Sequence, residues 1–153
     1  MIYIRENMNY LSFDVGIKNL AYCCLTPEKK IVQWGILNLN DNPQCQMKKR
    51  KQCDKQSSYI IDQKDYYCSV HSKEFTKKKK LNTNYDLCKL SQKCIEKLRT
   101  IDMTNIQHVI IENQPALKNP TMKSIQMIIY TFFILEGLMN EESTVTNVQM
   151  INA

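Results

Sequence analysis

The sequence predicts an α/β fold: a mixed five-stranded sheet with flanking helices and a small insertion that carries Cys and His. Two observations lead to this prediction. Three apolar runs joined by tight links open the chain, and helix-type and strand-type patterns alternate after residue 81. Between them, residues 41–80 show no periodicity that could bury a core. We therefore expect one domain, formed by residues 1–40 and 81–153, with an insertion at 41–80.

Three strands are expected before the insertion, at residues 9–16, 19–25 and 31–39. Each run is rich in apolar and aromatic side chains, which suit a pleated, half-buried surface. The links between them are too short for a crossover connection. Three successive strands with such links form an antiparallel meander.

The second half of the chain alternates between helix and strand. Leu87, Leu90, Cys94, Leu98 and Ile101 recur at spacings of three and four, which predicts an amphipathic helix over residues 82–101. Thr83 or Asn84 can cap that helix. The elements expected after it are a buried strand at 108–113, a strongly apolar helix at 122–140 and a last strand at 143–151. The two strands would form the parallel part of the sheet.

Composition narrows the class of protein. Hydrophobic residues make up 43% of the 153 residues, enough for a real core. The seven cysteines are odd in number and no signal peptide is visible, which favours a reduced compartment and metal binding over disulfides. The longest apolar run, residues 127–135, is too short for a bilayer span. We expect an intracellular protein that is not secreted and has no membrane partner.

The positive charge is concentrated in the insertion. The formal net charge is +6, and residues 41–80 carry 11 Lys or Arg against 5 Asp or Glu, so the whole excess lies there. A concentrated basic patch attracts polyanions, nucleic acid first among them. The run Lys48, Lys49, Arg50 and Lys51 is the first candidate for DNA contact. The alternative is a solvated basic loop or a localisation signal.

Two carboxylates stand at matching places in the predicted strands. Asp14 lies in the first strand just before Gly16, and Glu112 lies at the end of the fourth. Carboxylates at neighbouring strand ends can converge on divalent metal ions such as Mg²⁺, which prefer hard oxygen ligands. The alternative is that both acids mark where strands meet water.

Four soft or borderline metal ligands lie in the insertion. Cys45, Cys53, Cys68 and His71 follow the spacing C-x7-C-x14-C-x2-H. The closing C-x2-H pair can reach one ion, whereas the x7 gap is looser than in common zinc ribbons. Because the segment has no core of its own, we expect a structural Zn²⁺ to supply its folding energy. The alternative is a disordered loop with incidental cysteines.

Two longer motifs carry a resemblance to a known family. "FDVGIKNLAYC" and "VIIENQPALKNPTMKSIQMIIYTFF" resemble the Holliday-junction resolvases of poxviruses and other large DNA viruses, which are RuvC-like members of the RNase H fold. The first motif has the family's Asp-x-Gly-x-x-Asn form, and the second its Ile-Glu-x-Gln stretch followed by an apolar helix. The closing "VTNVQMINA" is similar to the family's fifth strand.

The resemblance implies a structure-selective endonuclease that resolves four-way DNA junctions in recombination and repair, with Mg²⁺ or Mn²⁺ at the catalytic site. It implies that Asp14 and Glu112 are catalytic metal ligands and that Lys118 or Lys123 contacts phosphates, solvent exposure being the alternative for either lysine. It also implies a homodimer, for which helix 122–140 is a candidate surface unless it is wholly buried in the monomer. A viral protein of this kind would act in the host cytoplasm, in a viral factory, or in the nucleus.

The chain departs from the family at its end. Family members continue past the fifth strand into a helix with two further acids, and the sequence stops at Ala153, so the resemblance predicts an incomplete form with half of the expected carboxylates. Two other functions therefore remain open. One is a non-catalytic module that binds branched DNA or other nucleic acid, and the other is an RNase H-fold nuclease that acts on RNA–DNA hybrids.

Overall fold

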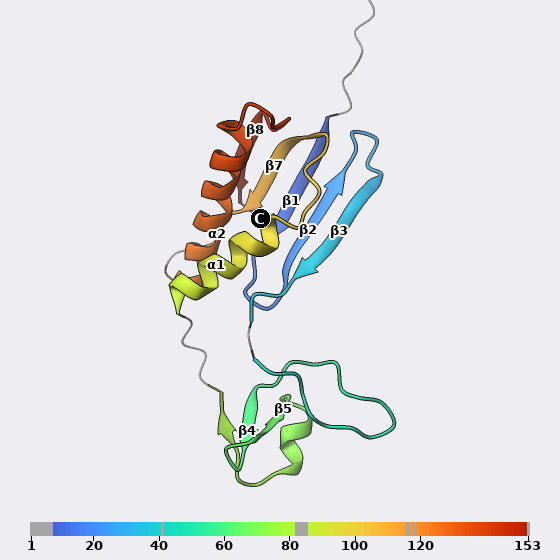
Figure 1. Ribbon diagram of the computed structural model, residues 1–153, viewed down its shortest axis with the longest axis vertical. Helices are drawn as coiled ribbons and strands as arrows, with labels where there is room; N and C mark the ends of the chain where they lie inside the picture. Colours follow the sequence, from blue (N-terminus) through green and yellow to red (C-terminus); the bar gives the residue numbers. More distant parts are fainter. Residues whose placement is uncertain (1–7, 41, 82–85, 116, 118, 153) are drawn as a thin grey trace, which may run out of the picture. The chain divides into compact units, whose positions relative to one another are not determined.

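The computed structural model describes residues 8–40, 42–81, 86–115, 117 and 119–152. The chain divides into two compact units (Figure 1). The core unit is drawn from Met1–Asn40 and Asp86–Ala153, and the insert unit from Asp41–Tyr85.

The core unit contains the predicted mixed five-stranded sheet, with strand order β3-β2-β1-β7-β8. Strands β1, β2 and β3 form the antiparallel meander, whereas β7 pairs parallel with β1 and β8 pairs parallel with β7. The fold class predicted from the sequence is thereby confirmed. The strand bounds are Asn9–Asp14 (β1), Leu20–Leu25 (β2), Ile31–Leu37 (β3), Ile106–Glu112 (β7) and Asn147–Ile151 (β8).

The side chains of the central strands alternate between two faces of the sheet. In β1, Leu11 and Phe13 are buried, whereas Ser12 is half-buried and Asp14 is exposed. A strand has a period of two, so a carboxylate that follows a core phenylalanine points to the other face. Asp14 can therefore extend a core strand without entering the core.

Two helices pack against each other and cover one face of the sheet (Figure 1). They are α1, Leu87–Leu98, and α2, Pro120–Phe133, which continues as the π-helical turn η2, Ile134–Leu138. Helix α1 begins later than predicted. Its N-cap is Asp86, whose carboxylate accepts hydrogen bonds from the backbone N–H groups of Cys88 at 2.9 Å and Lys89 at 3.3 Å. The predicted caps Thr83 and Asn84 lie outside the described residues.

The core forms where α2 meets the sheet. Ile125, Ile129 and Phe133 are fully buried, and the rings of Phe13 and Phe133 lie 5.3 Å apart. The same helix also has apolar side chains on its outer surface, such as Met127, which is 43% exposed. Burial therefore applies to one face of this helix, whereas its use as a dimer surface stays a prediction for the exposed face. None of the helices in the described part of the chain has the length and apolarity that crossing a bilayer requires.

The insert unit has regular structure that the sequence pattern does not reveal. It contains a three-stranded sheet of order β5-β4-β6 and a 3₁₀ turn, η1, which lies between β5 and β6 in the sequence. Asp62 and Gln63 link β4 and β5 with positive φ angles of 47° and 61°, which gives a tight hairpin turn. Such short strands are too brief to show a period. The bounds are Tyr59–Ile61 (β4), Asp65–Tyr67 (β5), His71–Glu74 (η1) and Lys79–Lys80 (β6).

Two substitutions in α2 test where the core lies. We expect Ile129→Ala to lower the free energy of unfolding by about 2–5 kcal/mol, because it leaves a cavity at a fully buried site. Met127→Ala on the outer face of the same helix is the matched control and is expected to cost roughly 1 kcal/mol or less. Urea unfolding followed by circular dichroism measures both, and equal losses would contradict the described packing.

Candidate functional site

Asp14 and Glu112 end two neighbouring parallel strands at the same edge of the sheet. Strands β1 and β7 run in register with Phe13 opposite Ile111, and both of these side chains are buried under the helices. The next residue along each strand is one of the two acids. Because side chains alternate, both carboxylates leave the sheet on its other face, side by side. The structure therefore brings together the two predicted acids, which are 98 positions apart in the sequence.

The two carboxyl groups interact directly. The pKa of Glu112 is raised, first by partial burial and then by a side-chain hydrogen bond and charge repulsion from Asp14, with a hydrogen bond from Gln114 acting in the opposite direction. Two like charges this close favour either a shared proton or a bound cation. The pair is thus a donor set suited to a divalent metal ion.

A tight turn fixes the position of Asp14. A Cβ atom on Gly16 would lie 2.7 Å from the carbonyl oxygen of Asn19, so a larger residue there would displace the backbone. The backbone N–H of Leu39 donates to the carbonyl of Ile17 at 3.0 Å and ties the turn to the chain beyond β3. Gly16 is therefore required by the turn itself, two residues after Asp14.

A buried glutamine fixes the loop that follows Glu112. Gln126 of α2 is fully buried, and its Oε1 accepts a hydrogen bond from the backbone N–H of Gln114 at 2.8 Å. Its amide Nε2 also donates to Asn113 Oδ1 at 3.4 Å. A buried amide with these partners holds the loop in one conformation. Sequence analysis missed Gln126, although a single glutamine in the apolar run 125–135 was a usable signal.

Lys123 lies next to the same loop. Its Nζ donates to Asn113 Oδ1 at 2.8 Å and to Gln126 Oε1 at 3.1 Å. The ammonium group is thus held near the residue that follows Glu112 rather than extended into solvent. A contact between Lys123 and a phosphate stays a prediction, and Lys118, the other predicted lysine, lies outside the described residues.

Asp14 also borders a shallow depression on the uncovered face of the sheet. The depression has a volume of about 320 Å³, and its lining includes Trp34 and Ile36 of β3. Trp34 is 70% exposed, which is unusual for so large an apolar side chain. An exposed indole beside a carboxylate offers a surface on which an unpaired base can stack. Sequence analysis did not single out Trp34, since a strand pattern alone does not tell which face a helix covers.

The two acids do not gather a third ligand within the described part of the chain. There, the only group of three or more His, Cys, Asp or Glu side chains close enough to share an ion is Cys45, Cys53, Cys68 and His71. Two carboxylates still fit Mg²⁺, which commonly keeps several waters and is bound by one or two carboxylates plus substrate phosphate.

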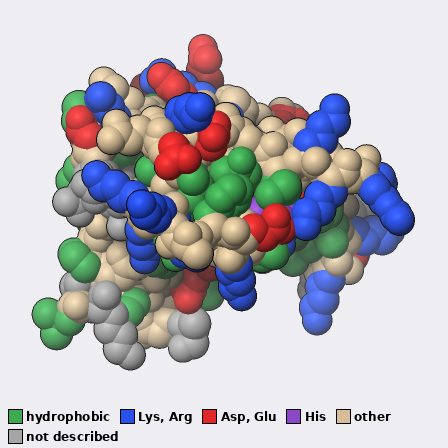
Figure 2. All heavy atoms as spheres, turned by 90° about the horizontal axis from the view of Figure 1, so that it is seen from below, with side chains coloured by type: hydrophobic (Ala, Val, Ile, Leu, Met, Phe, Trp, Pro, Cys, Tyr) green, Lys and Arg blue, Asp and Glu red, His purple; other side chains and the backbone are tan. Residues whose placement is uncertain are grey.

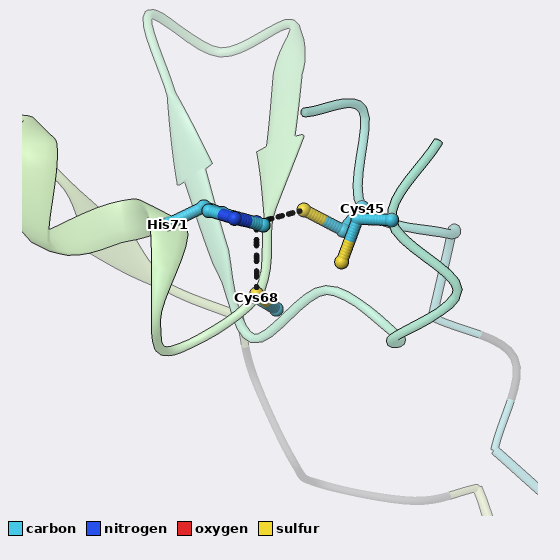
Figure 3. A group of neighbouring side chains, drawn as sticks. Cys45, Cys68 and His71 are labelled. Atoms are coloured by element: carbon cyan, nitrogen blue, oxygen red, sulfur yellow. Dashed lines mark hydrogen bonds between the residues drawn. The ribbon is translucent and has the colours of Figure 1, made fainter. Parts of the chain in front are cut away.

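The four predicted ligands of the insert unit meet at one point. Their Sγ and imidazole nitrogen atoms all lie within 4.8 Å of one another, and the Sγ atoms of Cys45 and Cys68 each lie 3.4 Å from His71 Nδ1 (Figure 3). Cys45 and Cys68 are buried, and Cys53 and His71 are half-buried. The structure thus closes the long x7 gap of the sequence pattern.

The backbone around this cluster affects its thiols. Burial is the largest influence on the pKa of Cys68 and raises it, but the backbone N–H groups of His71 and Val70 and the neighbouring thiols together lower it below its usual value. For Cys53 the backbone N–H of Lys55 lowers the pKa, and burial and the Cys45 thiol outweigh it, so the net shift is upward. Both sulfur atoms therefore accept backbone hydrogen bonds.

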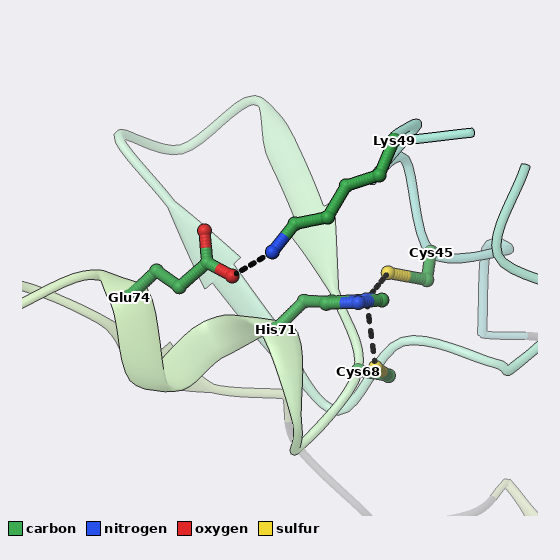
Figure 4. Close-up of polar contacts among 5 residues, drawn as sticks. All are labelled: Cys45, Lys49, Cys68, His71 and Glu74. Carbon is green, nitrogen blue, oxygen red and sulfur yellow. Dashed lines mark hydrogen bonds and ion pairs between the residues drawn. The ribbon is translucent and has the colours of Figure 1, made fainter. Parts of the chain in front are cut away.

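The basic run 48–51 forms the tip of a loop between Cys45 and Cys53. Two backbone hydrogen bonds join the two sides of this loop. The N–H of Cys45 donates to the carbonyl of Lys55 at 2.8 Å, and the N–H of Cys53 donates to the carbonyl of Met47 at 3.0 Å. At the tip, Lys49 Nζ lies 2.8 Å from a carboxylate oxygen of Glu74 in η1 (Figure 4). One face of the molecule shows many Lys and Arg side chains around its outline, with acidic groups between them (Figure 2).

Comparisons with known proteins agree with this architecture. A family model described as "Mitochondrial resolvase Ydc2 / RNA splicing MRS1" matches residues 10–138. The chain is 30% identical over 160 aligned positions to uncharacterized protein L451 of Acanthamoeba polyphaga mimivirus, a match that spans 78% of this chain and 39% of the viral protein. It is also similar to the crystal structure of the yeast mitochondrial Holliday junction resolvase Ydc2, with 16% identity and a TM-score of 0.50.

The structural match spans 98% of this chain and 55% of the yeast protein. At that identity the likeness concerns the fold, and it confirms the predicted RNase H-like architecture. The chain spans about two fifths of its viral relative and about half of the yeast structure.

The contact between the two acids can be tested by titration. We expect Asp14→Asn to lower the pKa of Glu112 toward its ordinary value, because the substitution removes the like charge that helps to raise it. Carbon-detected NMR of the Glu112 side chain in metal-free buffer measures the shift. Asp102→Asn, which changes another surface acid, is the control and should leave Glu112 unaltered. An unchanged Glu112 titration in Asp14→Asn would show that the carboxylates are apart.

Proposed function

The chain belongs to the Ydc2 catalytic-domain family, and from this premise we propose that it is an endonuclease that cuts four-way DNA junctions. The observation that carries the proposal is the contact between Asp14 and Glu112 at the ends of two parallel strands. The yeast protein of the same fold is named as a Holliday junction resolvase, which supports branched DNA as the substrate. The likeness to a mimivirus protein supports a viral setting and action inside a host cell.

The acid pair would hold Mg²⁺ or Mn²⁺. A divalent ion bound there supplies charge neutralisation at the scissile phosphate and activation of the attacking water. The protein's own part is positional. The glycine turn orients Asp14, and the buried amide of Gln126 orients the loop after Glu112. Both acids extend from paired strands, which restrict their movement more than loops would.

Lys123 is the basic group that best fits a role at the substrate backbone. Its ammonium group lies between Asn113 and Gln126, next to Glu112 in the chain. A cation held there can attract a phosphate to the acid pair, which on its own repels one. Lys118 stays in the proposal as a second phosphate contact, from the sequence pattern alone.

The insertion at residues 41–80 would act as a separate DNA-binding attachment. It carries the whole positive excess of the chain, including Lys48, Lys49, Arg50 and Lys51. Contacts of lysine and arginine with phosphates add affinity without sequence choice and weaken as salt rises. This fits an enzyme that recognises the shape of a junction rather than its sequence.

A second candidate function is nucleic-acid binding without cleavage. The family description names an RNA splicing protein beside the resolvase. In addition, the two acids gather no third protein ligand within the described residues. Cleavage of RNA–DNA hybrids is the remaining alternative for a nuclease of this fold.

A nicking assay on a labelled four-way junction tests the nuclease proposal. We expect cutting that requires Mg²⁺ or Mn²⁺, stops with a chelator, and falls to background in Asp14→Asn and in Glu112→Gln, because each removes a metal ligand. Gln126→Ala should reduce cutting by about 10–100-fold, the usual cost of losing a group that orients a ligand. Asp102→Asn is the control that should cut normally.

The same assay separates the alternatives. A linear duplex and an RNA–DNA hybrid of equal length are run beside the junction. Preferred cutting of the hybrid would move the substrate from junctions to hybrids. Tight junction binding with no cutting under any metal condition would favour the binding module.

We further propose that the protein acts as a homodimer, since a four-way junction presents two equivalent strands to cut. A groove of about 360 Å³ between α1 and α2 supports this proposal, because apolar side chains that a second copy could cover line it, among them Ile95, Met127 and Leu135. Leu135 is 55% exposed.

Light scattering after size exclusion tests the dimer. We expect Leu135→Glu to give a monomer, because it introduces a charge into the apolar groove. Met139→Glu, at a 68% exposed position that does not line the groove, should leave the dimer intact. A wild-type protein that is monomeric at all concentrations would argue against this part of the proposal.

A further inference from the structure

We propose that Cys45, Cys53, Cys68 and His71 hold a single zinc ion through three thiolates and Nδ1, and that this ion stands in for a hydrophobic core in the insert unit. The site lies outside the acid pair and does not depend on the proposed nuclease activity.

The first argument is the geometry at His71. Its Nδ1 lies 3.4 Å from both the Cys45 and the Cys68 sulfur atoms (Figure 3). A ring nitrogen has either one proton or one lone pair, so hydrogen bonding can satisfy one thiol and not two. A shared ion explains both contacts. Bond lengths in tetrahedral zinc sites place nitrogen and sulfur about 3.5 Å apart and two sulfurs about 3.8 Å apart.

The second argument is the backbone around the sulfur atoms. Cys68 accepts hydrogen bonds from the N–H groups of Val70 and His71, and Cys53 accepts one from Lys55. Thiolates that bind a metal are commonly held and tuned by such donors.

The third argument is the lack of an ordinary core. Among the described residues 42–81, the buried side chains are those of Cys45, Ser57, Ile61, Cys68 and Ser72. Two of these are ligands, two are serines, and one is a large aliphatic. So little apolar burial does not offset the entropy of ordering the segment. Metal binding, which supplies folding free energy directly in small modules, does.

The ion would also fix the shape of the basic loop. Cys45 and Cys53 lie at its two ends. The backbone N–H of Cys45 donates to Lys55 and that of Cys53 donates to Met47. Anchoring both ends to one ion limits the conformations that the loop between them can adopt. This consequence concerns the shape of the loop and holds whatever the loop binds.

Cobalt substitution of the full chain tests the site. We expect one equivalent of Co²⁺ to bind, with sulfur-to-cobalt charge-transfer bands and intense visible bands of a tetrahedral ion, and one equivalent of Zn²⁺ to displace it. Cys53→Ser and Cys68→Ser should each weaken or abolish these bands. Cys88→Ser, which changes an exposed cysteine on α1, is the matched control and should bind normally.

Two-dimensional NMR of the same full chain tests the role in folding. Chelation should collapse the amide signals of residues 42–81 while those of β1, β2 and β7 remain dispersed, and Zn²⁺ should restore them. The proposal is overturned if no stoichiometric metal binds, if Cys68→Ser binds as the wild type does, or if the insert signals survive chelation. A disulfide among the three cysteines in protein purified under reducing conditions would also overturn it.

Discussion

The parallel pairing of β1 with β7 is the contact on which the candidate site depends. It joins segments from opposite sides of the insertion, and a hydrogen bond of 2.8 Å from the Asn9 backbone to the Gln107 side chain helps to set its start. With Phe13 opposite Ile111, the acids that follow are neighbours by register alone. A slip by one residue would turn one of them into the core. The insertion, α1 and the loop before β7 must all be accommodated without disturbing this register.

The pairing also explains how the fold tolerates two adjacent like charges. Partial burial and the neighbouring Asp14 carboxylate both raise the pKa of Glu112, so the two acids are held beside each other in an arrangement that a cation would favour. Buried rings and aliphatics directly behind them, Phe13 and Ile111 among them, stabilise the strands that carry the charge. Functional sites commonly have this arrangement, in which binding groups are strained and the surrounding core is not.

Sequence patterns predicted the elements that are long enough to show an apolar run or a regular spacing. They missed features that depend on tertiary contacts. The five sheet strands and both helices were expected, because apolar runs mark the strands and α2, and a spacing of three and four residues marks α1. The role of Gln126 was not, since hydropathy treats a buried amide as a break in an apolar run. Leu87 was expected on the buried face of α1 and is 49% exposed, because the helix begins at that residue, where its first turn projects from the core. Trp34 was passed over because exposure depends on which face the helices cover.

The insert unit shows why spacing alone is a weak guide to a metal site. The x7 interval between Cys45 and Cys53 is loose as a linear pattern, yet backbone pairing brings its ends together and leaves the basic residues at the tip. The hairpin-like loop thus brings Cys45 and Cys53 close together, as the two-residue interval does for Cys68 and His71. The two units therefore order their charged groups by different means. In the core unit, buried apolar side chains hold strands that end in acids, whereas in the insert unit the proposed zinc ion would hold a loop that carries lysine and arginine side chains. Because metal binding needs almost no apolar sequence, the proposed ion would let a polar, lysine-rich segment fold between the two parts of the sequence that form the core unit.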